Sequence, residues 1–221
     1  IENNLIKYAK VSKDRDTFKV DAFGIRFFDN LNEAIKKIVE ETYSFTTPIS
    51  INLANEQYLY YDIFALLSKN DIQKTVETEF ETFCDENKYN QKAFETRYAL
   101  VSNVQNKERI KAIQVIVNKI ELNKQKQYLE KHNLSGILPI GTAIASITRF
   151  EKKENVLIVN MEEKTTITTI YDRQIYNVET IDHGSQEVLE KINRTENSMS
   201  KAYEICKGTT IYTANVIDDA K

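Results

Sequence analysis

Three consecutive strand-like segments followed by a long helical segment limit the possible folds of this chain more than any other feature. The strand-like segments cover residues 156–159, 165–171 and 175–181 and are separated by short polar turns. Gly184 then precedes residues 186–207, in which apolar side chains recur at helical spacing. Strands that lead directly into a helix predict an α/β unit.

The start of the chain has a similar order of elements. The sequence predicts strands over residues 5–11 and 17–28, a helix over 31–43 that Asn30 caps, and a strand over 49–53. A helix that connects two strands allows the later strand to lie parallel to an earlier one, and we expect such a pairing here. The sequence therefore predicts a second α/β unit, related to the first.

Between these units the sequence predicts a compact α/β insertion and then a return to the first unit. The expected elements of the insertion are a strand, a helix capped by Ser68, two paired strands and a polar helix, over residues 57–67, 69–86, 94–104, 109–117 and 119–132. A strand over 136–139 and a short helix over 142–147 follow. The predicted subdomains are a first core subdomain (1–56 and 134–151), the insertion (57–133) and the start of a second core subdomain (152–221).

Composition excludes several classes of protein. With 41% hydrophobic and 29% charged residues, the chain is neither intrinsically disordered nor membrane-spanning. Its net charge of −3 argues against a general nucleic-acid-binding protein. Only two cysteines are present, Cys84 and Cys206, without a CxxC motif, so we expect a reducing compartment.

Motifs of known catalytic and metal sites are missing from the sequence. The two histidines, His132 and His183, do not have a cysteine or carboxylate at the spacing of metal ligands. The chain contains no GxGxxG, GxxxxGK[ST] or GxSxG motif. We therefore expect no catalytic residues, no metal site and no enzymatic activity. A cysteine–histidine catalytic pair is geometrically possible, but no motif supports it.

Three segments resemble the phosphate-binding elements of the actin-like ATPase superfamily. Residues 1–11 resemble the first phosphate-loop hairpin, and residues 156–166 resemble the second, which is normally Asp-x-Gly-x-x-x-Thr between two strands. Residues 181–185 stand where these families place two glycines before a helix. Within the superfamily the chain is most similar to the PilM family of type IV pilus assembly proteins, an FtsA-like branch. This similarity rests on residues 20–25, 31–43, 49–53, 69–81 and 97–101.

The resemblance implies an actin-like (ribonuclease H-like) fold of mixed-sheet subdomains, in which residues 57–133 form an inserted α/β subdomain of the 1C type. The first core subdomain would correspond to 1A and the second to 2A. The second would be incomplete, with its remaining strands beyond Lys221.

The resemblance also implies a degenerate phosphate-binding site. Its positions are held by Asn4, Lys7, Thr165, Thr166 and Gly184. We expect any binding of ATP with magnesium there to be weak or absent, because other positions of the family pattern have changed.

The changed positions are Glu2, Asn160, Glu162 and His183. Glu2 and Glu162 stand in place of glycines that let main-chain N–H groups approach a phosphate, and each adds a negative charge. Asn160 replaces an acid that would hold magnesium or its water ligands.

For function, the resemblance implies a bacterial cytoplasmic scaffold that binds the N-terminal cytoplasmic peptide of a bitopic inner-membrane protein similar to PilN. The chain would lie at the inner face of the membrane through this partner, without membrane insertion and without nucleic acid. The groove between the first core subdomain and residues 57–133 is the expected binding site. The sequence does not identify the residues that line it.

Two alternative functions remain open, a nucleotide-binding actin-like ATPase and an FtsA-like cell-division protein. The second requires an amphipathic C-terminal helix, which these residues do not contain. Tyr58, Tyr60 and Tyr61 are consistent with an interaction surface and equally with the ordinary preference of tyrosine for strands.

Overall fold

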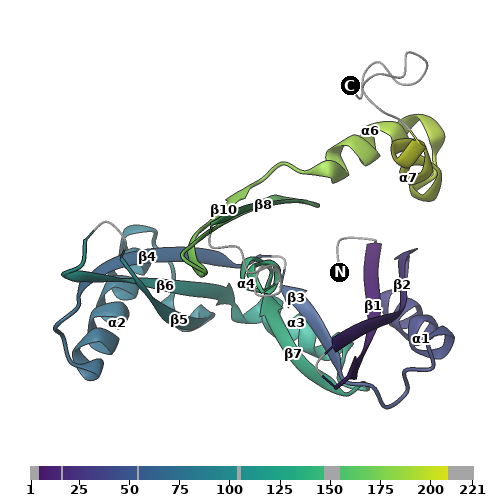
Figure 1. Ribbon diagram of the computed structural model, residues 1–221. Coiled ribbons are helices and arrows are strands. Elements are labelled where there is room, and N and C mark those ends of the chain that lie inside the picture. The colour runs from purple at the N-terminus through teal and green to yellow at the C-terminus, as the bar shows by residue number, and fades with distance from the viewer. Residues whose placement is uncertain (1–4, 16, 54, 104–105, 147–154, 209–221) are drawn as a thin grey trace. The chain divides into compact units, whose positions relative to one another are not determined.

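The computed structural model describes residues 5–15, 17–53, 55–103, 106–146 and 155–208 and has the predicted mixed α/β architecture (Figure 1). In chain order the described elements are β1 (Leu5–Asp14), β2 (Thr17–Phe27), α1 (Leu31–Glu41), β3 (Ile49–Leu53), β4 (Gln57–Phe64), α2 (Lys69–Glu86), the short 3₁₀ helix η1 (Gln91–Ala93), β5 (Phe94–Ser102), β6 (Arg109–Asn118), α3 (Lys119–Tyr128), β7 (Leu134–Pro139), α4 (Ile140–Ala145), β8 (Val156–Met161), β9 (Thr165–Tyr171), β10 (Gln174–Ile181), α6 (Ser185–Glu196) and α7 (Met199–Gly208).

The described strands form four small sheets. β1 pairs with β2 and β6 pairs with both β4 and β5, in each case antiparallel, while β8, β9 and β10 form a sheet in the order β10-β9-β8. β3 pairs in parallel with β7. Among the described residues β3 does pair in parallel, but with a later strand and not with an earlier one as predicted, and the chain reaches this partner only after residues 57–133.

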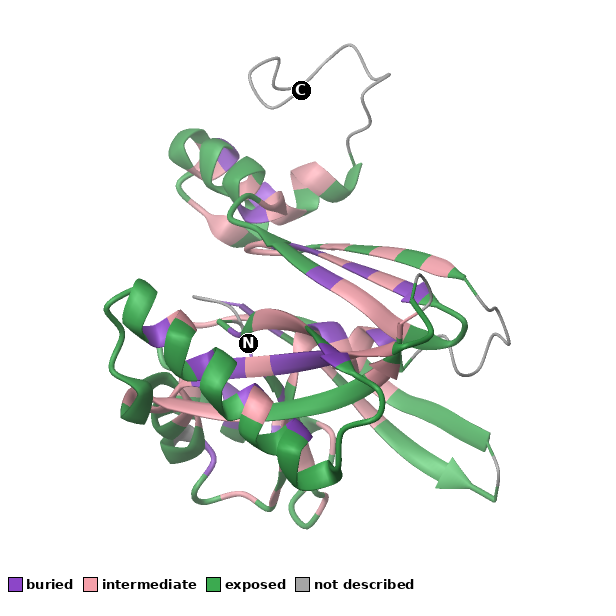
Figure 2. Cartoon of the chain, turned by 90° about the vertical axis from the view of Figure 1, so that its left-hand side faces the viewer, coloured by how far each residue is buried: buried purple, intermediate pink, exposed green. Residues whose placement is uncertain are grey.

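A hydrophobic core lies between α2 and one face of the β4-β6-β5 sheet. Ser68 caps α2 through an Oγ that accepts a hydrogen bond from the Asp71 N–H at 3.2 Å. The buried positions of the helix recur every four residues: Ile72, Val76, Phe80 and Cys84 (Figure 2). Phe83, which the sequence predicts for this stripe, is only half-buried, because a spacing of four continues the stripe at position 84.

Two predicted helices differ from the observed ones. The single helix predicted over 186–207 is two helices, because Asn197 adopts a left-handed conformation (φ 49°, ψ 31°) that ends α6. Ser198 precedes α7, and its Oγ accepts a hydrogen bond from the Lys201 N–H at 3.4 Å. The helix predicted over 119–132 ends at Tyr128, before the buried residue Leu129.

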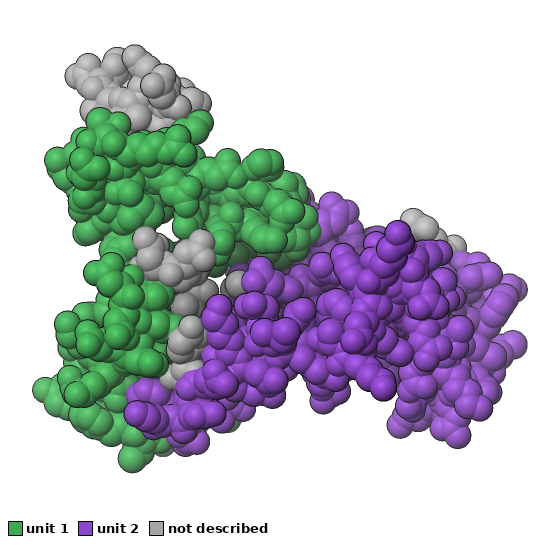
Figure 3. All heavy atoms as spheres, turned by 180° about the vertical axis from the view of Figure 1, so that it is seen from behind, with its two compact units in different colours: residues 1–47, 159–166, 180–221 green, residues 48–158, 167–179 purple. Residues whose placement is uncertain are grey.

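The chain divides into two compact units (Figure 3). Unit 1 comprises residues 1–47, 159–166 and 180–221, and unit 2 comprises residues 48–158 and 167–179. The subdomain boundaries predicted from the sequence stay predictions, since this division groups residues by compactness alone.

Candidate functional site

Unit 1 brings a lysine of the first hairpin into contact with the turn between β8 and β9. Lys7 Nζ lies 2.9 Å from Glu162 Oε1, and the two side chains are partly exposed to solvent. Lys7 is one of the predicted phosphate-site residues, and Glu162 is one of the residues predicted to disfavour a nucleotide. Their ion pair joins two segments that are 155 positions apart in the sequence.

Gly184 lies directly against the main chain of this turn. A Cβ atom at Gly184 would lie 2.1 Å from the Glu162 carbonyl oxygen and 2.7 Å from that of Glu163. The backbone of Gly184 is extended (φ −155°, ψ −174°), so the need for glycine arises from this close approach and not from an unusual φ.

The same turn occupies hydrogen-bonding groups at the start of α6. The Gln186 N–H donates to the Glu162 carbonyl at 3.3 Å, and Ser185 Oγ donates to the Met161 carbonyl at 3.0 Å. Helix N-termini bind anions through such N–H groups. Here a carbonyl of the chain's own turn accepts the hydrogen bond from one of them.

The remaining predicted phosphate-site residues differ in their placement. Thr165 is buried and donates through Oγ1 to the His183 carbonyl at 2.7 Å, and Thr166 is buried beside it in β9. Asn160 is half-buried in β8. Asn4 and Glu2 lie outside the described residues. Lys7, Thr165 and Gly184 thus converge on the same turn, and their role in phosphate binding stays a prediction.

A further ion pair and a histidine hydrogen bond lie at this turn and the start of α6. Lys164 Nζ lies 2.7 Å from Asp182 Oδ1, and the hydrogen bond and charge of this lysine lower the pKa of Asp182. His183 Nδ1 lies 2.6 Å from Glu187 Oε1 in the first turn of α6. The polar side chains of this region therefore interact mainly with one another.

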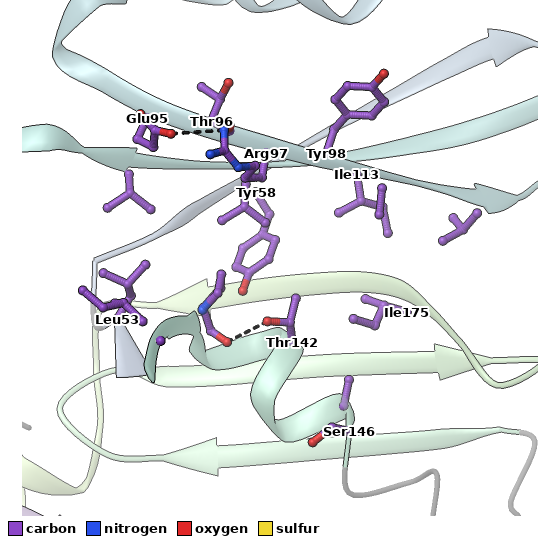
Figure 4. Close-up of a pocket in the computed structure, with 18 of the residues that line it drawn as sticks. Leu53, Tyr58, Glu95, Thr96, Arg97, Tyr98, Ile113, Thr142, Ser146 and Ile175 are labelled. Carbon is purple, nitrogen blue, oxygen red and sulfur yellow. Dashed lines mark hydrogen bonds and ion pairs between the residues drawn. The ribbon is translucent and has the colours of Figure 1, made fainter. Parts of the chain in front are cut away.

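A second candidate site is a large pocket within unit 2, with a cavity volume of about 930 Å³. β5 and β6 line one side of the pocket, and β3, β7 and α4 line another (Figure 4). Residue 170 of β9, residue 173 of the following turn, and residues 174 and 175 of β10 complete the lining. Part of its lining belongs to residues 57–133, the predicted insertion. That this groove is the predicted peptide-binding site stays a prediction.

The floor of this groove is an apolar face of β6. Ala112, Gln114 and Ile116 are buried on the face that carries α2, so the alternation of a strand directs the odd-numbered residues to the opposite face. Ile113, Val115 and Val117 line the groove from there. α2 covers one face of β6 and the groove lies on the other, so both faces carry apolar side chains and the strand has a nearly continuous apolar sequence.

Glu56 and Tyr58 support one end of the groove. Glu56 Oε1 accepts from the Ile140 N–H at 2.6 Å and from Tyr58 OH at 3.1 Å, while the Gly141 N–H donates to Tyr58 OH at 3.2 Å. The carboxylate thereby holds the start of α4 against β4. Burial raises the pKa of Glu56 above its usual 4.5, although these hydrogen bonds oppose the shift.

Stability is expected to depend on pH through Glu56. Because the pKa of this group is higher in the folded than in the unfolded chain, its contribution to stability is present below pH 4.5 and is lost as pH rises through the folded pKa. The Glu56→Gln variant should therefore gain stability relative to the native chain as pH rises from 4.5, as measured by urea unfolding at several pH values. A constant difference between the two proteins across pH would contradict the expectation.

Tyr60 and Lys111 attach β10 to the face of the sheet beside the groove. Tyr60 OH donates to the Val178 carbonyl at 2.8 Å and accepts from its N–H at 2.6 Å, and burial raises the pKa of Tyr60 to about 12. Lys111 Nζ lies 4.1 Å from the centre of the Tyr176 ring.

The structure favours the structural interpretation of the tyrosine cluster. The Tyr61 hydroxyl donates to Gln114 Oε1 at 3.0 Å, and the hydroxyls of Tyr58 and Tyr60 are bonded as described above. All three hydroxyl groups are therefore engaged within the chain.

The fold resembles solved structures, although the sequence matches no protein-family model and has no significant match among curated proteins. A chain of the PilM-PilN type IV pilus biogenesis complex has a TM-score of 0.70 at 14% identity, over 93% of this chain and 67% of that chain. The cytoplasmic domain of EpsL, an inner membrane component of the type II secretion system of Vibrio cholerae, has a TM-score of 0.54 at 12% identity, over 85% and 69% of the two chains.

A third structure, a Bacteroides thetaiotaomicron protein with an actin-like ATPase fold and unknown function, has a TM-score of 0.47 at 9% identity, over 88% of this chain and 73% of that chain. At these identities the first two likenesses establish a shared fold, and the predicted α/β fold class with mixed sheets is confirmed. Within the described part of the chain, no helix has the length and apolar character needed to span a membrane.

Proposed function

We propose that this chain is a non-catalytic scaffold of a type IV pilus or related secretion assembly. In this role it holds the N-terminal cytoplasmic peptide of a PilN-like bitopic membrane protein in the groove of unit 2. The partner would keep the chain at the cytoplasmic face of the membrane. The observation that carries the proposal is the groove itself, a 930 Å³ concavity with an apolar floor beside the predicted insertion.

The fold supports this assignment. A chain of a PilM-PilN complex has the same fold at a TM-score of 0.70, and the second comparison with a TM-score above 0.5 is also an inner-membrane assembly component. A scaffold of this kind requires a pre-formed concave surface and no chemistry. The groove provides apolar anchor sites on β6 and main-chain groups on β5, which are the two elements that peptide recognition commonly uses.

The contacts around Glu162 support a role without catalysis. Lys7 is paired with the Glu162 carboxylate, and the Gln186 N–H donates to the Glu162 carbonyl. A bound phosphate would have to displace these contacts and would meet the negative charge of Glu162. An actin-like ATPase would require this region to bind a nucleotide. An FtsA-like protein would require an amphipathic membrane-binding helix after it.

Peptide binding can be tested by calorimetric titration of the chain with the N-terminal cytoplasmic peptide of the PilN-like protein from the same organism. An Ala99→Trp variant should weaken binding at least about tenfold, because Ala99 is exposed on the groove side of β5 and the indole would fill the groove. Lys74→Trp, which places the same indole at an exposed position of α2 in the same unit, is the control and should bind normally. Equal affinities of the two variants would place the peptide elsewhere.

A nucleotide is expected to leave the stability of the chain unchanged. A ligand that binds only the folded state adds about 2.7 kcal/mol at one hundred times its Kd, so even moderate affinity is visible as a rise in the melting temperature. Thermal unfolding with Mg-ATP should match thermal unfolding with magnesium alone. A rise that grows with ATP concentration would favour the actin-like ATPase instead.

A further inference from the structure

β5 is an edge strand whose outer main-chain groups can be identified from the ladder. In the described part of the sheet the order is β4-β6-β5, so β5 has a neighbour on one side only. The Ala65 N–H donates to the Glu108 carbonyl at 2.9 Å, across the end of the β4–β6 pair. Because main-chain groups of successive residues point to alternate neighbours, even-numbered residues of β6 point to β4 and odd-numbered ones point to β5.

The residue pairs between β5 and β6 show which main-chain groups of β5 point to β6 and which point away. Tyr98 lies opposite Gln114 and Leu100 lies opposite Ala112, so these even-numbered pairs are not hydrogen-bonded. The N–H and C=O groups of Tyr98 and Leu100 therefore point away from β6, toward the open edge. Side-chain hydrogen bonds to Ser102 and Thr96, at the two ends of the strand, agree with this direction.

Two side chains form hydrogen bonds with outer main-chain groups near the two ends of β5. Gln174 Oε1 accepts from the Ser102 N–H at 2.9 Å, and Arg97 Nη1 donates to the Thr96 carbonyl at 3.0 Å. Between them, the main-chain groups of Tyr98 and Leu100 make no hydrogen bond to another segment that the structure describes. The open part of the edge is thus bounded at both ends.

The groove runs along this open edge. Its lining includes every residue from 95 to 101, although alternate residues of a strand face opposite sides of the sheet. Figure 4 shows the Tyr98 side chain on the opposite side of the sheet from those of Tyr58 and Ile113. The cavity therefore borders β5 along residues 95–101, the part of the strand that carries the outer N–H and C=O groups of Tyr98 and Leu100.

We infer that the partner peptide binds by adding a β-strand to the outer edge of β5, with main-chain hydrogen bonds to Tyr98 and Leu100. This inference rests on the proposed function and specifies how the groove recognises its partner. The occupant is an extended segment that presents apolar side chains at alternate positions to the β6 floor.

The test is an N-methyl scan of the PilN-like peptide, measured by calorimetric titration against the native chain. Each N-methyl group removes one main-chain donor and blocks close approach of a neighbouring strand. Methylation at alternate positions, those that face β5, should weaken binding at least about tenfold, while methylation at the positions between should change it less than about threefold. The scan leaves the protein itself unaltered.

A protein variant provides an independent readout. Leu100→Pro removes an outer N–H without removing a ladder hydrogen bond to β6, and Leu100→Thr keeps that N–H while changing the side chain. We expect Leu100→Pro to weaken binding of the unmodified peptide at least about tenfold, and Leu100→Thr to weaken that binding much less. Thermal unfolding checks that both variants fold, and the scan stands alone if Leu100→Pro does not.

The outcomes are distinguishable. A loss of affinity at every second methylated position of the peptide supports the inference. If the peptide binds but the losses of affinity do not alternate along it, or if Leu100→Pro and Leu100→Thr bind it with equal affinity, the inference is overturned and the proposed function stands. No binding of the unmodified peptide overturns both. A native dimer that Leu100→Pro converts to a monomer in sedimentation would identify a second copy as the occupant and would overturn the inference as well.

Discussion

The Gly184→Ala variant is expected to lose about 1–3 kcal/mol of unfolding free energy, which is a substantial part of the stability of a typical domain. The added Cβ would lie 2.1 Å from the Glu162 carbonyl oxygen, where no pair of atoms can remain. Both atoms belong to the main chain or are fixed to it, so no side-chain rotation relieves the overlap. The turn between β8 and β9 must separate from the start of α6, and the hydrogen bond from the Gln186 N–H to Glu162 is lost with it.

Urea unfolding followed by circular dichroism measures this loss. Gly208→Ala is the matched control within the same unit, because a Cβ at Gly208 meets no atom within 4 Å. The control should be neutral or slightly stabilising, since alanine is the better helix former and Gly208 belongs to α7. If Gly184→Ala were as stable as Gly208→Ala, the turn and the helix would not approach each other as described.

The role of Gly184 in phosphate binding stays a prediction, while the structure shows a separate need for glycine at this position. The resemblance to actin-like ATPases selected this position as a site where a glycine lets main-chain groups approach a phosphate. In the structure the glycine lets the main chain approach its own turn. The sequence pattern identifies the need for close approach at position 184. Only the coordinates show which group makes that approach.

Local signals predicted most of the fold. The caps Asn30 and Ser68 each accept a hydrogen bond from the third residue beyond them, so the starts of α1 and α2 follow directly from the sequence. The break between α6 and α7 also had a local signal, the pair Asn197-Ser198, which ends one helix and caps the next. Apolar spacing that continues across the pair outweighed this signal in the sequence prediction.

The groove could not be predicted residue by residue, because it depends on segments that are distant in the sequence. Ile113 and Leu134 line it from strands of different sheets, and Gln174 reaches it from beyond the insertion. The one available signal was the apolar run of residues 112–117, interrupted only by Gln114, which indicates a strand covered on both faces. Such a run predicts that the second face is covered and does not identify what covers it.

Phe80→Ala is expected to have the largest effect on stability, a loss of about 3–5 kcal/mol. The Phe80 side chain is 4% exposed and packs with Cys84 and Ile116 in the core between α2 and the sheet. Its ring lies edge-on to that of Phe94 with 6.2 Å between centroids. Removal of the ring would leave a cavity that the sheet cannot close without moving β5, which Phe94 begins.

The measurement is urea unfolding of the native chain, of Phe80→Ala and of Phe45→Ala, the last as a control because Phe45 is 68% exposed. The control should lie within about 0.5 kcal/mol of the native chain. Because β5 forms the open edge of the groove, hydrogen exchange of the main-chain N–H groups in β5 should also accelerate in Phe80→Ala under conditions in which the variant remains folded. A loss below about 1 kcal/mol would mean that Phe80 does not fill this core, and the support of β5 would then have to come from other residues.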